Sequence, residues 1–273
     1  MRRRWTIAGL ARGVLLAIAL VTVVFPFLWI LLTSLKPPDL VARPDVWLFA
    51  PSADNWRDVL QGSSVPRYIG NSIIVGLATV VITLIVGCPA AYAFSRFKTG
   101  GGAGRFSILA AEMMPPAVLI VPFFLLMYRL ALIDTLWAVV AAHLTFVAPV
   151  VVWFLIGFID EVPRELEEQA MVDGYTQFQA FYKVILPVIR PGLAASAIFA
   201  FVLSWNDMFY ALILTGGANK TLPVAIAGYW TFRGIEMGKM AVAILIAIVP
   251  VLIAAFFVQK HLVKGLGGGA VKF

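Results

Sequence analysis

The longest charged interval between two apolar segments of this chain contains the stretch Glu168-Gln169-Ala170-Met171-Val172-Asp173-Gly174, followed by Val184-Ile185-Leu186-Pro187. The interval runs from Asp160 to Arg190, and both flanking segments are long and apolar enough to lie in hydrocarbon. Because the rest of the chain is poor in charge, we expect this interval to be the part that another protein contacts from the aqueous side.

The composition is that of a membrane protein. Of the 273 residues, 62% are hydrophobic and 13% are charged, whereas soluble domains carry about a quarter charged residues. The single cysteine, Cys88, excludes an internal disulfide framework, and the spacing of Cys and His predicts no metal site or cofactor. The net charge of +7 gathers at the ends of apolar segments, which indicates membrane topology rather than nucleic-acid binding.

Six apolar stretches approach the ~20 residues that a helix needs to cross a bilayer. They are Val14–Leu32, Ser72–Phe94, Phe106–Met127, Leu136–Phe158, Leu193–Leu214 and Met240–Val258. We therefore predict an all-α integral membrane protein with six transmembrane helices. The first stretch is longer than the apolar part of a signal peptide and no small-residue cleavage site follows it, so we interpret it as a retained helix.

The basic residues orient the predicted helices. Six spans place both termini on one side, and with the termini inside, the short loop 95–105 carries three basic residues and no acidic one. Most of the 21 Lys and Arg residues then lie in inside loops. The positive-inside rule therefore predicts that both termini and the interval 160–190 are cytoplasmic.

These predictions describe a single transmembrane domain over residues 1–273. Its parts are a cytoplasmic N-terminus (1–13), a first span (14–32), an extracytoplasmic cap (33–67), a five-helix core (68–258) with a cytoplasmic loop (159–191), and a cytoplasmic tail (259–273). The cap is rich in proline and tryptophan, so we expect it to be folded rather than flexible. Prolines interrupt most spans, which lipid tolerates where neighbouring helices or a wet cavity satisfy the freed backbone groups.

Polar residues occur inside two of the predicted spans. Glu112 lies in the third, and Asn206 and Asp207 lie in the fifth. An ionisable group at membrane depth is costly unless it is paired or hydrated, so each is a functional candidate. We favour an interfacial or paired position for Glu112. Asn206 and Asp207 fit equally well with lining a path through the membrane and with bonding helices together, and His143 is interpreted as a helix-packing residue.

Local signals predict two short helices within the charged interval. Pro163 suits the first position of a helix, and Glu165, Glu167 and Glu168 favour a helix N-terminus. This first helix is expected to end at Gly174, because glycine adopts the left-handed conformation at a helix C-terminus with little cost.

The second helix is expected to begin at Thr176, where Gln179 three residues later completes a capping box. It is expected to end at Leu186, because Pro187 disfavours helix in the residue before it. Helices this short are marginal in water, so their apolar residues need a surface that is made partly of protein outside this chain. These residues are Leu166, Ala170, Phe178, Phe181 and Ile185.

Three patterns that suggest nucleotide or nucleic-acid binding fail in context. The interval holds six acidic residues against Arg164, Lys183 and Arg190, which disfavours a DNA-binding helix-turn-helix. The segment 216–221 lacks the glycine before lysine of a phosphate loop and lies on the predicted outside. No strand precedes the glycine-rich segment 99–104, which we interpret as a short flexible cytoplasmic turn. We therefore predict no ATP hydrolysis by this chain.

The charged interval resembles the cytoplasmic signature of ATP-binding-cassette (ABC) importer permeases. That signature is Glu-Ala-Ala, three residues, Gly, nine residues, Ile-x-Leu-Pro, and here it reads Glu168-Gln169-Ala170, Gly174 and Val184-Ile185-Leu186-Pro187. The chain departs from the signature at two positions: Gln169 stands in place of the first alanine, and Val184 in place of the isoleucine. Asp173 before the glycine matches the common form of the signature. Gln169 is larger than alanine, which bears on the fit to an ATPase.

The chain also resembles the carbohydrate-uptake branch of these permeases, the maltose-permease type of subunit. Three features carry this resemblance over essentially the whole chain: Asn71-Ser72 at the start of the second span, Ser204-Trp205-Asn206-Asp207, and the tail Gly265-Leu266-Gly267-Gly268-Gly269-Ala270-Val271-Lys272.

The resemblance implies the type I ABC importer permease fold in a bacterial inner membrane. It further implies a second permease subunit, giving a heterodimer, two cytoplasmic ATPase subunits, an extracytoplasmic solute-binding protein, and no catalytic residue. The loop residues implied to contact an ATPase are Glu168, Gln169, Ala170, Asp173, Gly174, Phe178, Leu186 and Pro187. The tail residues implied to do so are Gly265, Leu266, Gly269, Ala270, Val271 and Lys272, and Asn206 and Asp207 are candidates for the translocation path.

Two alternatives remain open at the level of sequence. One is an importer permease of the same fold for another solute, such as a glycerol phosphate diester. The other is a self-sufficient secondary transporter that uses Glu112 and Asp207, although two carboxylates are few for a proton relay.

Overall fold

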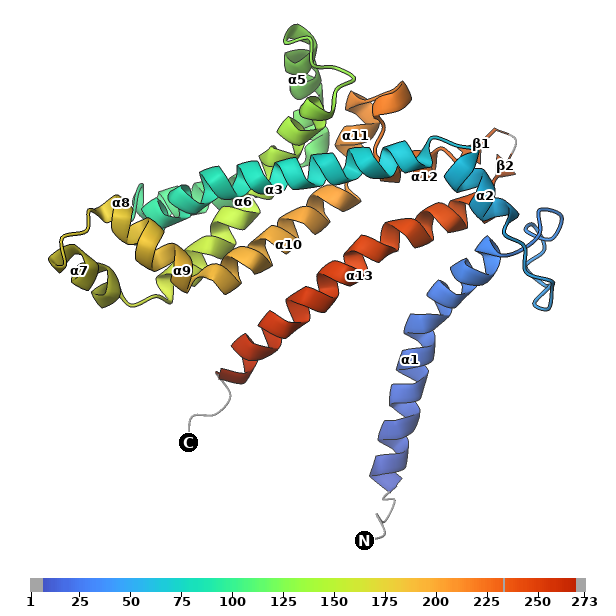
Figure 1. The fold of residues 1–273 in the computed structure, drawn as a ribbon, viewed down its shortest axis with the longest axis horizontal. Coiled ribbons are helices and arrows are strands. Elements are labelled where there is room, and N and C mark those ends of the chain that lie inside the picture. The colour runs from blue at the N-terminus through green and yellow to red at the C-terminus, as the bar shows by residue number, and fades with distance from the viewer. Residues whose placement is uncertain (1–6, 233, 269–273) are drawn as a thin grey trace. The chain divides into compact units, whose positions relative to one another are not determined.

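A computed structural model describes residues 7–232 and 234–268 of the protein. These residues are helical apart from loops and one antiparallel hairpin of β1 (Trp230–Thr231) and β2 (Gly234–Ile235) (Figure 1). They form two compact units. The first comprises Met1–Pro66 and Ile226–Val249, and the second comprises Arg67–Ala225 and Pro250–Phe273.

The first unit contains α1 (Ile7–Ser34), α2 (Asp54–Gln61), the hairpin and the first part of α13 (Met237–Gly268). Asn55 of α2 is buried, and its side-chain amide donates to the carbonyl oxygens of Ser34 at 3.2 Å and Lys36 at 2.9 Å. These bonds hold the start of α2 against the end of α1. The segment between the two helices therefore connects two ends that lie against each other.

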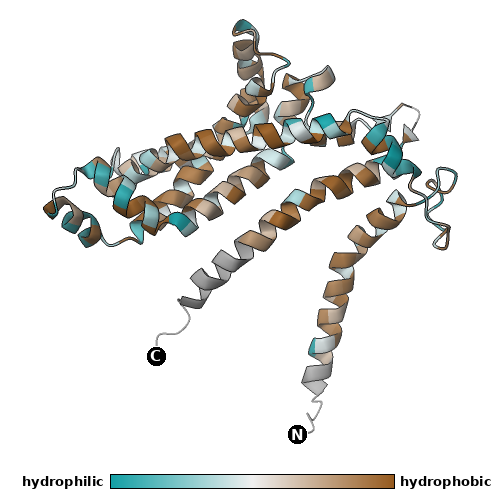
Figure 2. Ribbon diagram, in the orientation of Figure 1, coloured by the Kyte–Doolittle hydropathy of each residue, from teal (hydrophilic) through white to brown (hydrophobic). Residues whose placement is uncertain are grey.

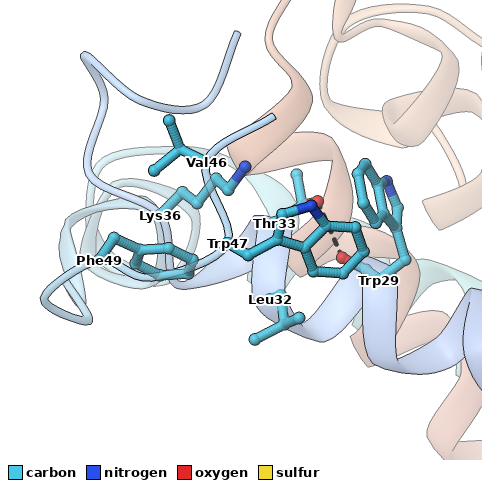
Figure 3. A pocket seen from close by; sticks show the side chains of 7 residues that line it. All are labelled: Trp29, Leu32, Thr33, Lys36, Val46, Trp47 and Phe49. Atoms are coloured by element: carbon cyan, nitrogen blue, oxygen red, sulfur yellow. Dashed lines mark hydrogen bonds between the residues drawn. The ribbon is translucent and has the colours of Figure 1, made fainter. Parts of the chain in front are cut away.

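An aromatic cluster encloses Lys36 in this segment (Figure 3). The ammonium group donates to the carbonyl oxygen of Arg43 at 2.7 Å and lies 5.8 Å from the ring centre of Trp29 and 5.7 Å from that of Phe49. Such cation–π contacts stabilise a desolvated ammonium. Trp47 packs edge-on against Trp29, so the first loop is built around one buried cation.

The second unit is built on α6 (Leu136–Asp160), which packs against α3 (Val65–Arg96), α4 (Gly101–Glu112) and α10 (Arg190–Asn206). Val151, Leu155 and Ile159 of α6 are fully buried in its core. A second cluster joins α6 to α5 (Pro116–Arg129), α11 (Phe209–Leu214) and α12 (Leu222–Ala227). Figure 1 shows α7 (Arg164–Val172) and α8 (Gln177–Ala180) at the end of α6 away from α5 and α11.

Within the described residues, four helices are long and apolar enough to cross a membrane. Their spans are Ala11–Ser34, Val65–Arg96, Leu136–Asp160 and Met237–Phe257, and Gln177–Val188 with Arg190–Asn206 makes a fifth if that pair, bent by 77°, counts as one. Figure 2 shows these helices largely hydrophobic, and hydrophilic residues at α2, α7 and α8. The described residues therefore hold four or five candidate spans, and the six transmembrane helices that the sequence predicts are not confirmed.

The third predicted span, 106–127, is wrong as a continuous helix. The helix α4 ends at Glu112 and α5 begins at Pro116. Pro115 has an extended backbone, with φ −58° and ψ 130°, because a proline drives the residue before it out of the helical region and Pro116 follows it. The hydropathy of this stretch is high on both sides of the break, so apolar content alone did not reveal it.

The glycine-rich segment 99–104, expected to be a turn, contains the start of α4. Lys98, Gly100 and Gly101 have positive φ values of 50°, 68° and 59°, and the helix begins at Gly101. The fifth predicted span, 193–214, is also broken, between Asn206 at the end of α10 and Phe209 at the start of α11.

The helices α6 and α10 can pack closely because residue 192 is a glycine. A Cβ atom built at Gly192 would lie 2.5 Å from the ring of Phe158, whereas one at Gly157 of α6 would meet nothing within 4 Å. We expect Gly192→Ala to destabilise the purified protein by about 1–3 kcal/mol through overpacking. Gly157→Ala, the control, should raise stability by up to ~1 kcal/mol through helix propensity. Thermal unfolding in detergent measures both, and equal midpoints would contradict this packing.

Candidate functional site

The helix α7 is bounded by the two residues that the sequence predicts, Pro163 and Gly174, but it begins one residue later than predicted. Pro163 is the N-cap residue rather than the first helical residue. At the other end Gly174 has φ +91°, its N–H donates to the carbonyl of Met171, and the N–H of Tyr175 donates to that of Ala170. This pair of bonds is a Schellman motif, which closes a helix C-terminus around a left-handed glycine.

The second helix begins as predicted but ends later. The Thr176 side chain accepts from the N–H of Gln179 and the Gln179 side chain accepts from the N–H of Thr176, which completes the capping box. The chain then continues through a π-helical turn, η1 (Phe181–Ile185), and α9 (Leu186–Val188), so the expected end at Leu186 is wrong.

The π turn explains why Pro187 does not end this helix. A proline clashes with the carbonyl four residues before it in an α-helix, and that carbonyl belongs to Lys183, inside the widened turn. The helix instead ends at Ile189, with φ −87° and ψ 10°, before α10 begins with Arg190-Pro191. The bend between the two helices is 77°.

The two helices of the loop present an exposed apolar surface, which we call the α7–α8 face. Phe178 is 70% exposed and Val172 is 87% exposed. The rings of Phe178 and Tyr182 lie 4.6 Å apart and form one aromatic patch. We use this name for the exposed large apolar residues of the loop before Lys183, which are Leu166, Met171, Val172, Tyr175, Phe178 and Tyr182.

The rest of the loop packs on the chain itself. Ala170, Phe181 and Ile185 are buried, although all three were expected to need protein outside the chain, and the ring of Phe181 lies 4.7 Å from that of Tyr92 in α3. Glu168, Gln169, Asp173 and Gly174 are exposed, and Leu186 and Pro187 are partly buried. The predicted site residues therefore divide between an outer face and an anchoring side.

Sequence reasoning missed one charged residue of the loop. Glu167 is 5% exposed and forms an ion pair with Arg96 of α3, at 3.0 Å from Oε2 to Nε. From the sequence, Glu167 is assigned, with Glu165 and Glu168, only to the negative charge that favours a helix N-terminus. It lies three residues before buried Ala170, on the same side of the helix, so the two side chains point inward together.

The break between α10 and α11 is held by a cluster around Asp207. Asp207 Oδ2 lies 3.1 Å from Nε2 of His143 in α6 and accepts from the N–H of Tyr210 at 3.2 Å. Nδ1 of His143 lies 2.7 Å from the hydroxyl of Ser204. His143 is 1% exposed, so its predicted packing role is confirmed, and Asp207 bonds three helices.

Asp207 also borders a cavity of about 510 Å³. The cavity is mainly aromatic, and it is lined by Pro116, Phe146, Val150, Trp153, Phe154, Phe199, Leu203, Asp207 and Tyr210. The Asn206 side chain is exposed and donates back to the carbonyl of Val202 in its own helix. Asp207 thus bonds helices together and also borders this cavity, whereas Asn206 is not among the residues that line it.

The remaining predicted residues lie apart from the loop and from the Asp207 cluster. Glu112 is the last residue of α4, directly before the break. Gly265 and Leu266 belong to the end of α13, and Gly269, Ala270, Val271 and Lys272 lie outside the described residues.

The Asp207 cluster predicts a difference between two neighbouring residues. Asp207→Ala removes the acceptor for buried His143 and for the first N–H groups of α11, and a buried donor without a partner costs about 1–3 kcal/mol. Asn206→Ala, the control, removes one bond to its own helix. We expect a lower thermal midpoint in detergent for Asp207→Ala only. A loss of similar size in both variants would refute the role of the cluster.

Comparison with known proteins gives consistent matches. Residues 80–268 match the family described as binding-protein-dependent transport system inner membrane component. The chain is 36% identical over 253 residues to the trehalose transport system permease protein SugB of Mycobacterium tuberculosis, covering 90% of this chain and 92% of that protein. It is 33% identical over 265 residues to the sulfoquinovosyl glycerol transport system permease protein SmoH of Agrobacterium fabrum, covering 96% and 93%.

A solved structure shares the fold. It is a bacterial ABC transporter involved in the import of the acidic polysaccharide alginate, with a TM-score of 0.79 and 24% identity over 95% of this chain and 98% of that chain. At this identity the likeness establishes the fold alone, which is the fold expected from the sequence.

Proposed function

Because the chain belongs to the family of inner membrane components of binding-protein-dependent transport systems, we propose that it is the permease subunit of an ATP-driven sugar importer. The exposed α7–α8 face is the observation that carries this proposal. Val172 and Phe178 of this charged loop are 87% and 70% exposed, and large exposed apolar patches mark protein interaction sites.

The partner at this face is a cytoplasmic ATPase subunit. Acidic Glu168 and Asp173 border the apolar residues and are exposed, so they suit basic groups on the partner. The chain lacks a nucleotide-binding motif of its own, and ATP hydrolysis belongs to two such subunits. When they close on ATP, the α7–α8 face moves with them, provided that its contact differs between the two states.

Gly174 tests this docking. Its φ of +91° makes any other residue strained, while a Cβ there would meet nothing within 4 Å. Gly174→Asp should leave the protein in the membrane but reduce ATP-driven uptake about tenfold or more, because ~1–2 kcal/mol of backbone strain alters the docking turn. Uptake and ATP hydrolysis are measured on the assembled transporter in proteoliposomes.

Gly101→Asp is the matched control for this experiment. Gly101 also has positive φ, 59°, and open space around its Cβ position, but it lies outside the loop. The Gly101 variant should keep its uptake. Normal ATP-driven uptake by the Gly174 variant would show that this turn does not couple the ATPase to transport.

The arrangement in the membrane follows from the positive-inside rule. We propose six spans with both termini in the cytoplasm, in the inner membrane of a bacterium, with the third span formed by the broken pair α4 and α5. A second permease subunit completes the path, and an extracytoplasmic binding protein delivers the solute. The tail residues Gly265 to Lys272 remain candidates for further contact with the ATPases.

A sugar or oligosaccharide is the proposed solute. The named relatives transport trehalose and sulfoquinovosyl glycerol, and the cavity beside Asp207 has the chemistry that suits such molecules. Trp153, Phe154 and Phe199 offer ring faces for the apolar side of a sugar ring, and the Asp207 carboxylate accepts hydroxyl hydrogen bonds. We propose that the cavity is part of the translocation path, and that Asp207 rather than Asn206 lines it.

Two tryptophans of α6 test the cavity. Trp153 lines it, whereas Trp137, 62% exposed on the same helix, does not. Trp153→Ala should lower uptake of labelled trehalose or sulfoquinovosyl glycerol about tenfold through the loss of an aromatic contact of ~1–1.5 kcal/mol. Trp137→Ala should not. If both variants import these sugars at the normal rate, or a glycerol phosphate diester alone is imported, the sugar path is wrong.

A further inference from the structure

A buried ion pair connects the loop helix α7 to the membrane helix α3. Glu167 of α7 and Arg96, the last residue of α3, lie 3.0 Å apart, and each side chain is 6% exposed. The two residues are 71 positions apart in sequence. Most ion pairs of a protein lie at the surface and contribute little, so this one requires an explanation.

The remaining polar atoms of the pair are also satisfied. Arg96 donates from its second terminal nitrogen to the carbonyl of Val162 at 2.8 Å, and the hydroxyl of Tyr92 donates to the other carboxylate oxygen of Glu167. A buried ion pair is tolerated only with such additional hydrogen bonds. The Glu167–Arg96 pair therefore fixes α7 to α3 and to the segment after α6 at once.

A second, half-exposed pair extends this connection. Asp160 at the end of α6 accepts from the hydroxyl of Ser95 in α3 at 2.5 Å and from both terminal nitrogens of Arg105 in α4, at 3.0 and 3.2 Å. The ends of α3, α4 and α6 next to α7 are thus linked by charged hydrogen bonds. On its other side α7 carries the exposed apolar residues Met171 and Val172.

We infer that the Glu167–Arg96 pair transmits the displacement of α7 to α3, an inference that rests on the proposed docking of an ATPase. The apolar contact of Ala170 alone would let α7 roll about its own axis, since dispersion and hydrophobic contacts have little direction. The two-sided hydrogen bonding of Glu167 fixes that rotation. A force on the α7–α8 face therefore moves the end of α3 instead of turning α7 in place.

This role differs from a contribution to stability, and the difference is open to experiment. Replacing a buried ion pair by apolar side chains of similar volume often leaves stability unchanged or raises it, whereas removing one partner is strongly destabilising. The variant Tyr92→Phe/Arg96→Met/Glu167→Met removes all three polar side chains together. We expect this triple variant to assemble in normal amounts with α7 folded. It lacks the hydrogen bonds that Glu167 and Arg96 make between α7 and α3.

The test uses the complete transporter, purified with its ATPase subunits, and follows hydrogen–deuterium exchange with and without ATP plus vanadate. In the wild type we expect nucleotide to change exchange both in α7, residues 164–172, and in the end of α3, residues 88–96. In the triple variant the change in α7 should remain and the change in α3 should be lost. Arg43→Met/Asp45→Met, an exposed pair in the other unit, is the control.

The outcomes separate this inference from the proposed function. An unchanged α3 response in the triple variant overturns the inference and leaves ATPase docking intact. No response of α7 in the wild type overturns the docking itself. If the triple variant does not assemble, Glu167→Gln removes the charge and one of the two acceptor oxygens, and an undiminished α3 response in that variant overturns the inference.

Discussion

Inside hydrocarbon every backbone N–H and C=O group needs a partner within the protein, and the broken helices of this chain depend on that constraint. Between α10 and α11, Asp207 accepts from the N–H of Tyr210 and from His143, so one carboxylate replaces helical hydrogen bonds and joins α6 to the break. Between α4 and α5, Pro115 and Pro116 lack N–H groups and so leave fewer donors to satisfy. Each break therefore carries its own means of being tolerated.

The long helices and the local caps could be predicted because their signals are local. Hydropathy places α1, α3, α6 and α13, and the capping box at Thr176 and the stop at Gly174 follow from residues within a few positions. The breaks within apolar runs, and the burial of Glu167, could not be predicted in the same way. Glu167 is buried because it pairs with Arg96, which lies 71 residues earlier in the sequence. An acidic residue near a helix N-terminus is equally favourable when it is exposed to water, so its position in the sequence did not indicate burial.

The loop between α6 and α10 combines two surfaces with different partners. One side is bound to the chain through Glu167 and Phe181, and the other exposes Phe178 and Val172. A docking element of an importer needs both, since a segment bound only to the ATPase would move without the membrane helices. The order of buried and exposed residues along α7 and α8 thus follows from a requirement to belong to two assemblies at once.

The π turn at Phe181–Ile185 gives this loop an unusual sensitivity to length. One residue more or less in a helix rotates everything after it by about 100°. Here a deletion within the turn would restore ordinary α-helix, carry Pro187 into a clash, and rotate the residues beyond it away from the core that Ile185 and Ile189 enter. We therefore expect homologous chains to differ in this segment by substitutions rather than by insertions or deletions. The number of residues between the positions of Thr176 and Pro191 should stay the same.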